Sequence, residues 1–350
     1  MSLTRETESA ILKCYQPRLV PLETNLTAAV FPFMKIYPAE FCVRRAQQEG
    51  WITSQSLVVE SSSGNMAMGL AIVCNLRGYP LTIVSDYACD ATLKRRLEDL
   101  GARVEIVPAP SATGGYQRAR LDKLEQIRQE TPDHWWVNQY DNPCNPGAYS
   151  SFAAQLIESL GQIDILVGTV GSGGSMCGTV SYLKQLFPEI TAVAVDTFGS
   201  VLFGQPDKHR ELRGLGNSLL PRNLDHTIFD DVHWVGAAEA YKATRLLHQT
   251  TSLFCGGTSG AAWLVASYLA RRHPDAKIVC IFPDDGSRYV DTIYDDSYLF
   301  QNKLYLADVS VEPRKVSHPR DAGSIWSWME WGQRTYDQAV GLAQARVVGT

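Results

Sequence analysis

The stretch Val58–Ala71, VVESSSGNMAMGLA, joins a β-branched run to a run of helical composition through three serines, a glycine and an asparagine. At a strand-to-helix junction, small hydroxyl groups and the N–H groups of the first helical turn bind anions, because the start of a helix carries partial positive charge. We therefore interpret this stretch as an anion-binding loop suited to a carboxylate.

Short apolar runs recur on both sides of this loop, and stretches with helical spacing lie between many of them. The runs that we predict to be buried strands are 56–60, 81–85, 103–107, 135–139, 164–170, 191–196 and 277–283. Repeated strand–helix–strand units are typical of parallel sheets covered by helices on both faces. The first four runs are expected to form one sheet and the last three another. We therefore expect two doubly wound α/β domains with a cleft at the carboxyl ends of their strands.

We expect residues 36–150 to form a smaller, mobile α/β domain, and residues 1–35 with 151–308 to form a larger one. Residues 309–350 are predicted to be a C-terminal extension. Its Trp326, Trp328 and Trp331 are expected to pack on the body or on a second subunit rather than to bind a ligand.

Composition excludes several classes of partner. The chain has 350 residues, 45% of them apolar, and a net charge of -5, so we expect a globular protein without a basic face for nucleic acid. No apolar run of signal-peptide or membrane-spanning length is visible, so we expect a soluble, cytoplasmic protein without a membrane partner. The eight cysteines are dispersed and form no CxxC pair, and the histidines lack ligand spacing, so we predict reduced core thiols and no metal site.

A second anion-binding loop is predicted at Gly168–Thr179, GTVGSGGSMCGT, between an expected strand and an expected helix. Glycines let the backbone approach an anion closely, so this segment has the character of a phosphate cup. It lacks the Lys-Ser/Thr of a Walker loop and the GxGxxG spacing. The alternative is a tight turn without a ligand. Two such loops on facing domains suit a ligand with a phosphate at one end and a carboxylate at the other, such as an amino acid joined to a phosphorylated cofactor.

Six segments in order resemble the fold type II pyridoxal-phosphate enzymes of the cysteine synthase and cystathionine β-synthase family, over roughly residues 20 to 305. These segments are KIYPAEFCVRRAQQEGWI, ESSSGN, NQYDNP, GSGGS, GGTSGAA and PDDGSRY. The resemblance implies pyridoxal 5'-phosphate (PLP) in the cleft between the two domains, and a homodimer. In the family a lysine lies thirty positions before the Asn of SGN, and 65 minus 30 gives Lys35 as the implied Schiff-base lysine.

The resemblance implies further roles, residue by residue. Asn65 would hydrogen-bond the ring hydroxyl of the cofactor, and Thr258 would hydrogen-bond its pyridine nitrogen. Asp285 stands where many relatives have a serine near that nitrogen. The segment that would wrap the phosphate comprises Gly171, Ser172, Gly173, Gly174 and Ser175. The residues that would hold the substrate carboxylate are Ser61, Ser62, Ser63 and Gln139.

Segments such as GGYQRARLDKLEQI and VDTFGSVLFG look like the siderophore-pathway branch, the N-(2-amino-2-carboxyethyl)-L-glutamate synthases. This likeness implies β-replacement on O-phospho-L-serine, or on O-acetyl-L-serine, through an aminoacrylate. L-Glutamate would be the nucleophile and the product a precursor of 2,3-diaminopropionate. Arg120 and Tyr140 match branch positions implicated in substrate binding, although Arg120 is equally well interpreted as a solvated helix residue.

Two departures keep alternatives open. The loop before Lys35 is about a dozen residues shorter than in the family, and Met66 replaces the threonine that usually follows SGN, which predicts a smaller or differently posed substrate. One alternative is a cysteine synthase or S-sulfocysteine synthase that uses sulfide or thiosulfate. Another is a non-catalytic binding protein that keeps the fold.

Overall fold

The computed structural model describes residues 4–112 and 115–341. Within them the chain divides into two compact units: 4–16 with 33–149, and 17–32 with 150–341. These bounds differ from the expected ones at the N-terminus. Helix α1 (Arg5–Lys13) belongs to the first unit, where Glu8 Oε1 lies 2.7 Å from Arg77 Nε. Residues 17–32 belong to the second unit because they add two strands to its sheet.

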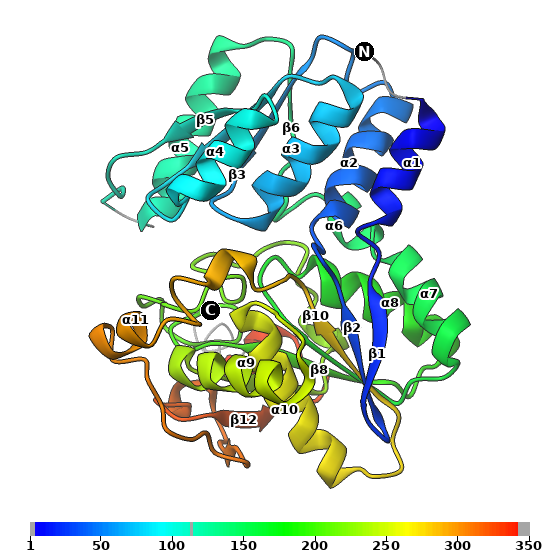
Figure 1. Ribbon diagram of the computed structural model, residues 1–350, viewed down its shortest axis with the longest axis vertical. Coiled ribbons are helices and arrows are strands. Elements are labelled where there is room, and N and C mark those ends of the chain that lie inside the picture. Colours follow the sequence, from blue (N-terminus) through cyan, green and yellow to red (C-terminus); the bar gives the residue numbers. More distant parts are fainter. Residues whose placement is uncertain (1–3, 113–114, 342–350) are drawn as a thin grey trace, which may run out of the picture. The chain divides into compact units, whose positions relative to one another are not determined.

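The first unit, drawn in Figure 1, is built on a four-stranded parallel sheet in the order β5-β4-β3-β6. The sequence predicts one sheet of four strands here but not their order. Its strands are β3 (Leu57–Ser61), β4 (Leu81–Ser85), β5 (Arg103–Ile106) and β6 (His134–Trp136). Its further helices are α2 (Ile36–Gln48), α3 (Asn65–Arg77), α4 (Ala91–Asp99), α5 (Gly115–Glu130) and α6 (Cys144–Gly147). Ile83 packs in a cluster with α2, α3 and α4, whereas its neighbour Val84 packs with Leu124 of α5. Since successive residues of a strand point to opposite faces, helices cover both faces of this sheet.

The second unit contains an eight-stranded sheet in the order β1-β2-β10-β7-β8-β9-β12-β11. Its strands are β1 (Arg18–Glu23), β2 (Leu26–Val30), β7 (Ile165–Thr169), β8 (Thr191–Asp196), β9 (Asp231–Trp234), β10 (Ile278–Phe282), β11 (Arg314–Lys315) and β12 (Ser327–Glu330). The central strands β2, β10, β7, β8 and β9 are parallel. The prediction of a second parallel sheet from 164–283 is confirmed, but β1, β2, β9, β11 and β12 lay outside the predicted runs.

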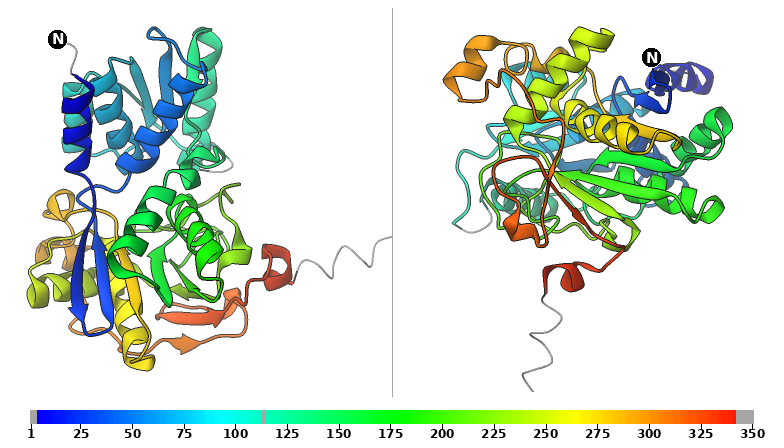
Figure 2. Two further views of the ribbon diagram at one scale, coloured as in Figure 1. Left: turned by 90° about the vertical axis from the view of Figure 1, so that its right-hand side faces the viewer. Right: turned by 90° about the horizontal axis from the view of Figure 1, so that it is seen from below.

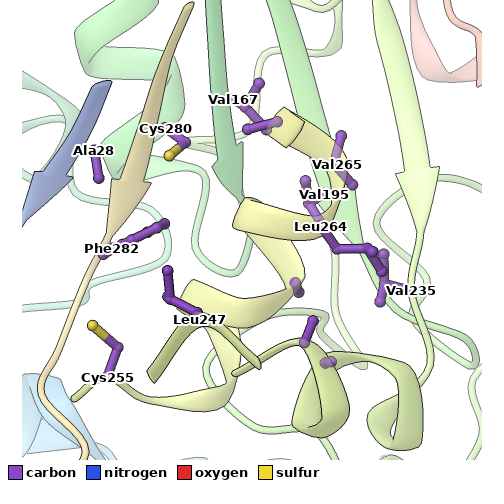
Figure 3. Close-up of a cluster of buried hydrophobic side chains, with 14 of the residues drawn as sticks. Ala28, Val167, Val195, Val235, Leu247, Cys255, Leu264, Val265, Cys280 and Phe282 are labelled. Atoms are coloured by element: carbon purple, nitrogen blue, oxygen red, sulfur yellow. The ribbon is translucent and has the colours of Figure 1, made fainter. Parts of the chain in front are cut away.

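Helices α9 (Ala237–Thr251) and α10 (Gly257–Arg272) pack closely in the core of the second unit. Figure 3 shows Val265 and Leu264 of α10 and Leu247 of α9 beside the strand residues Val195 and Phe282. A Cβ on Gly260 would overlap Thr244 Oγ1, so the absence of a side chain allows the two helices to approach. The other helices of this unit are α7 (Ser150–Leu160), α8 (Gly174–Leu186), α11 (Asp296–Gln301) and α12 (Tyr336–Val340).

The cysteines carry no cross-link: all eight are free, and all except Cys14 are buried. No cluster of metal-ligating side chains is found within 4–112 and 115–341. Over the same residues, none of the helices has the length and apolar character needed to cross a membrane.

The tryptophans of the C-terminal segment pack on the second unit. Strand β12 pairs antiparallel with β9 and extends one edge of the sheet (Figure 2). Trp326 and Trp331 are buried, and Trp326 Nε1 donates a hydrogen bond to His233 Nδ1 at 3.1 Å. Trp328 lies stacked near the His233 ring. Since Nδ1 accepts this bond, the buried imidazole is neutral.

His233 makes the stability of this unit depend on pH. Burial lowers the pKa of His233 to about 3, whereas an unfolded histidine has a pKa near about 6.5. The unfolded chain therefore binds a proton that the folded chain does not, and stability is lost as pH falls from about 6.5 towards 3, by up to about 1.4 kcal/mol per pH unit. His233→Gln keeps an acceptor for Trp326 but removes this titration. The stability advantage of the unchanged protein over His233→Gln should therefore shrink with falling pH, as measured by urea unfolding between about pH 8 and about pH 5. An advantage that does not vary over this range would contradict the expectation.

Candidate active site

The serine loop, residues 61–64, connects β3 to α3 in the first unit. The Ser62 hydroxyl accepts the N–H groups of Gly64 at 3.3 Å and Ala67 at 3.2 Å, so it stabilises the start of the helix. Asn65 is the first residue of α3. The predicted strand–loop–helix junction is thus present, and Ser62 is committed largely to holding it in place.

Ser61 and Gln139, both predicted to hold the substrate carboxylate, lie together. Ser61 is the last residue of β3 and Gln139 follows the neighbouring parallel strand β6, and Gln139 Nε2 donates to the Ser61 carbonyl at 3.1 Å. The Ser61 Oγ is buried and has no hydrogen-bond partner within the described chain. Because an unsatisfied buried hydroxyl is costly, this atom is a candidate donor to a bound anion.

Glu60, which the sequence reasoning did not select, ties these two segments together. Its carboxylate accepts the N–H of Ser61 at 2.7 Å and the N–H of Gln139 at 3.1 Å. Burial raises the pKa of Glu60 to about 7, against the opposing effects of these hydrogen bonds and of Arg120. A carboxylate at the end of an otherwise apolar strand was the available signal, because such a group needs several donors when buried.

Arg120 is a buried residue with 7% of its surface exposed, so its interpretation as a solvated helix residue is wrong. Its Nη1 donates to Ser63 Oγ at 2.9 Å, which joins α5 to the serine loop. Burial raises the pKa of Tyr140, and the charge of Arg120 opposes this shift, so Tyr140 lies within the electrostatic reach of the guanidinium. The structure therefore brings the two residues singled out by the branch likeness into one region.

Met66 lies in the hydrophobic core of the first unit, with 3% of its surface exposed. It packs among core residues of α2 and α3. Any effect of Met66 on substrate choice therefore acts through the packing of the serine loop, and its direct contact with substrate remains a prediction.

Lys35 immediately precedes α2 and is half-buried. A Cβ on Gly69, in α3, would lie 2.6 Å from the Lys35 carbonyl oxygen, so the lysine backbone packs directly on the helix that begins with Asn65. Burial lowers the pKa of Lys35 to about 8. Since a buried ammonium is disfavoured, a larger fraction of this amine is neutral and nucleophilic near neutral pH.

Gly69→Ala is expected to disturb this site although alanine favours helices by about 1 kcal/mol. The added methyl group overlaps the Lys35 carbonyl, and relieving this overlap should cost about 1–3 kcal/mol and shift the lysine. We expect a lower thermal midpoint and, from the predicted role of Lys35 as the Schiff-base lysine, a fall in kcat of about tenfold or more, because catalysis is sensitive to small displacements of a reacting group. Gly147→Ala is the matched control, since its Cβ would make an ordinary 3.5 Å contact with Phe41. Equal behaviour of the two variants would contradict the expectation.

The glycine-rich segment Gly171–Ser175 connects β7 to α8 in the second unit. Gly173 adopts a left-handed conformation with φ +80 and begins the helix without a side-chain cap. A Cβ on Gly173 would lie 2.8 Å from the Asn223 carbonyl oxygen, and one on Gly171 would lie 3.3 Å from that of Gly214. Only glycine fits at position 173 without strain, whereas a Cβ at position 171 would make a tight contact. The start of α8 therefore has the geometry expected of the predicted anion cradle.

Thr258 lies in the first turn of α10 and is buried, with its methyl group beside Gly214. Asp285, predicted to lie near it, is exposed, and its carboxylate accepts the N–H of Ser287 at 2.7 Å. The neighbouring Asp284 is the buried carboxylate of this segment. It accepts a hydrogen bond from Tyr289 Oη at 2.8 Å and lies beside Gly256, at the start of α10.

A family model described as pyridoxal-phosphate dependent enzyme matches residues 34–284, which include the serine loop, the glycine cradle, Lys35 and Thr258. The chain belongs to this family. It is 38% identical over 272 residues to the N-(2-amino-2-carboxyethyl)-L-glutamate synthase of Cupriavidus metallidurans, covering 76% of this chain and 80% of that protein. It is 36% identical over 269 residues to the protein of the same name from Ralstonia nicotianae, with 76% and 80% covered.

Solved structures share the fold. The O-acetyl serine sulfhydrylase isoform 3 of Entamoeba histolytica matches with a TM-score of 0.75 at 24% identity, over 85% of this chain and 96% of that one. The O-acetylserine dependent cystathionine β-synthase of Helicobacter pylori matches with a TM-score of 0.74 at 25% identity, over 81% and 98%. The predicted fold class, a PLP fold type II α/β architecture, is confirmed.

The chain is a PLP-dependent β-replacement enzyme that acts on small amino-acid substrates. The residues present fit the cofactor. The glycine cradle suits its phosphate, because Gly173 leaves no room for a side chain and the segment leads directly into the N-terminus of α8. The half-buried Lys35, with its lowered pKa, suits its aldehyde.

Proposed function

We propose that the enzyme replaces the phosphate of O-phospho-L-serine with the amino group of L-glutamate. The product is N-(2-amino-2-carboxyethyl)-L-glutamate, a precursor of 2,3-diaminopropionate. The two relatives named after this product support the reaction, since each is matched over 80% of its length. The structural observation that carries the choice of phosphoserine is the buried Arg120, whose guanidinium is bonded to Ser63 of the serine loop.

Arg120 favours the phosphorylated substrate on chemical grounds. A guanidinium matches the geometry and charge of a phosphate and donates several hydrogen bonds to it. The acetyl ester of serine carries no charge at that position, so a buried cation would contribute little to its binding. Asp86, 3.3 Å from Arg120 Nη1, offsets part of the cost of burying this cation. The unpartnered Nε leaves a donor for an anionic substrate group, which supports the phosphorylated substrate.

In this proposal the side chains of the chain have separate tasks. Lys35 would bind the cofactor and then remove the Cα proton of the substrate at its Nζ. Ser61, Ser63 and Gln139 would hold the substrate carboxylate. Asn65 would orient the cofactor ring, and the cradle Gly171–Ser175 would bind the cofactor phosphate. Thr258 and Asp284 would lie on the side of the ring that carries the pyridine nitrogen and hold it in place.

PLP supplies an electron sink for the Cα carbanion when bound. The Cβ–O bond of the substrate breaks, phosphate leaves with the bonding electrons, and the glutamate nitrogen forms a bond to Cβ and loses a proton. Lys35 returns the proton to Cα. We further propose that the enzyme acts as a homodimer in the cytoplasm, which size-exclusion chromatography with light scattering would test.

The test of the reaction is competition between substrates on the purified PLP-loaded protein. O-Phospho-L-serine and O-acetyl-L-serine are each offered with L-glutamate, sulfide or thiosulfate, and products are identified by mass spectrometry. We expect the glutamate adduct and free phosphate to form fastest from O-phospho-L-serine. Product only from sulfide or thiosulfate would support a cysteine or S-sulfocysteine synthase, and faster turnover of the acetyl ester would contradict the role of Arg120.

A further inference from the structure

Arg120 is held in an unusual setting for an arginine of a surface helix. It and Leu124 are the buried residues of α5, within the part of that helix whose side chains are described. Its Nη1 is shared between Ser63 Oγ at 2.9 Å and Asp86 Oδ2 at 3.3 Å. Its Nε is buried and has no hydrogen-bond partner among the described residues. A buried guanidinium with an unused N–H is ready to accept a further anion.

Asp86 is itself fixed by its local backbone. It follows the last residue of β4 and is 4% exposed. Its Oδ1 accepts the N–H of Ala88 at 2.8 Å, a turn that fixes the carboxylate and leaves Oδ2 directed at Arg120. A carboxylate held at one oxygen constrains the position of its ion-pair partner more strongly than a freely rotating one.

The sheet explains why Asp86 and the serine loop meet. Strands β3 and β4 are parallel neighbours, with Ser61 paired to Val84, so their carboxyl ends lie at the same edge. Ser63 and Asp86 both follow these ends, and α5 packs against the same two strands and supplies Arg120. Three segments distant in sequence therefore form one cluster.

Asp86 is not the only carboxyl group that can balance the positive charge of Arg120. Glu60 also exerts its charge on Tyr140, together with Asp86 and Arg120, so two carboxyl groups stand near one guanidinium. Burial raises the pKa of Glu60, which reduces the negative charge that accompanies Asp86 near neutral pH. The distinctive feature of Asp86 is its fixed contact with Arg120, which Glu60 does not make in any hydrogen bond or ion pair described for this part of the chain.

We propose that Asp86 is a positioning residue that holds Arg120 beside the serine loop and thereby sets the preference for a phosphorylated over an acetylated serine. This inference rests on the proposed function, because it assigns the origin of its substrate preference. Asp86 acts through Arg120 and does not itself contact the substrate.

The experiment measures the ratio of kcat/KM for O-phospho-L-serine to that for O-acetyl-L-serine in the PLP-loaded enzyme. In Asp86→Asn, Oδ1 still accepts the Ala88 N–H. The side-chain NH2 group then faces the Arg120 N–H groups, and because both are donors the contact with Arg120 is lost. We expect the ratio to fall about tenfold or more, mainly through KM of the phosphorylated substrate. If Asp86 acted only through its negative charge, removing that charge would strengthen phosphate binding and raise the ratio of the two kcat/KM values. A rise in this ratio, or no change, would therefore overturn the proposal.

A second variant separates position from charge and covers poor folding of the first. Asp86→Glu keeps the charge but displaces the carboxylate, and we expect the ratio to fall by about threefold or more. An unchanged ratio in Asp86→Glu would overturn the proposal. In an Arg120→Gln background, Asp86→Asn should change the ratio no further, and an additional fall there would show that Asp86 does not act through Arg120.

The matched control is Asp122→Asn, which breaks the exposed ion pair of Asp122 with Arg118 on the same helix. Its ratio should equal that of the unchanged enzyme. If the unchanged enzyme itself shows no preference for O-phospho-L-serine, the proposed function fails, and the selectivity assigned to Asp86 fails with it. If that preference is present but both Asp86 variants keep it, the Asp86 proposal alone fails.

Discussion

Lys35→Ala should lower kcat/KM for the activated serine by about a thousandfold or more while the protein stays folded. Loss of the amine removes both the anchor for the cofactor aldehyde and the base for the Cα proton, and proton transfer alone contributes about 10²–10⁴. Lys35 precedes α2, and its partly buried side chain makes no described ion pair. Kinetics and the absorbance of protein-bound PLP measure the two losses, and circular dichroism checks the fold.

The control for Lys35→Ala is Lys94→Ala, because Lys94 lies on α4 of the same unit with 44% of its side chain exposed. It should retain full activity. If Lys35→Ala turned over substrate normally, then Lys35 would not be the Schiff-base lysine, and the chemistry would need another amine.

The lowered pKa of Lys35 gives an independent readout. In protein freed of PLP, acylation of Lys35 should be half-maximal near its pKa of about 8, because only the neutral amine reacts. The neutral fraction therefore rises as pH increases through about 8, whereas an ordinary lysine becomes neutral only near about 10.4. Mass spectrometry of peptides that contain Lys35 and Lys94 compares the two in one sample, and parallel labelling of both would contradict the burial effect.

Gly173→Ala is expected to weaken PLP binding more than any other single methyl addition considered above. Alanine pays about 1–2 kcal/mol for the left-handed conformation at φ +80. Its Cβ would also lie 2.8 Å from the Asn223 carbonyl oxygen and from the Leu224 Cα, which costs about 1–3 kcal/mol more or displaces the cradle. The sum predicts a loss of PLP affinity of about 30-fold to 4000-fold if the cradle moves.

Gly161→Ala is the control that isolates backbone strain. Gly161 also has a positive φ, +70, but a Cβ there would meet nothing within 4 Å. It should lower the thermal midpoint slightly and leave the affinity for PLP unchanged. Titration of PLP followed by absorbance measures both variants, and equal affinities would show that the cradle does not hold the phosphate.

Much of the fold followed from local patterns. Short apolar runs predicted the strands 81–85 and 191–196 with their exact bounds in the structure, because a strand buried on both faces requires nearly continuous apolar residues. Strand β9, Asp231–Trp234, lacks this pattern since it contains a charged residue and a histidine. Its place in the sheet depends on pairing with β8 and β12, which are distant in sequence.

The candidate site also contains some features that the sequence predicts and others that it does not. The serine loop and the glycine cradle were predictable, because a strand followed by small polar residues and a helix is a local pattern. The burial of Arg120 was not, since α5 is polar over most of its length and gives no sign of which residue faces the sheet. Neither was the distinction between Asp284 and Asp285, because adjacent residues differ only in which way their side chains face after packing.

The sequence by itself determined the parallel strands of the two sheets and the order of the anion-binding loops, because each depends on residue types at short spacing. The cofactor and Lys35 as the candidate anchor followed from the resemblance of its segments to a known family. Only the tertiary structure decided that Glu60 joins Ser61 to Gln139 and that Asp86 and Ser63 share Arg120. These contacts form between segments up to 79 residues apart in the chain. Their existence depends on which strands pair and in which register, and this is fixed by the packing of the whole unit rather than by any local run of residues.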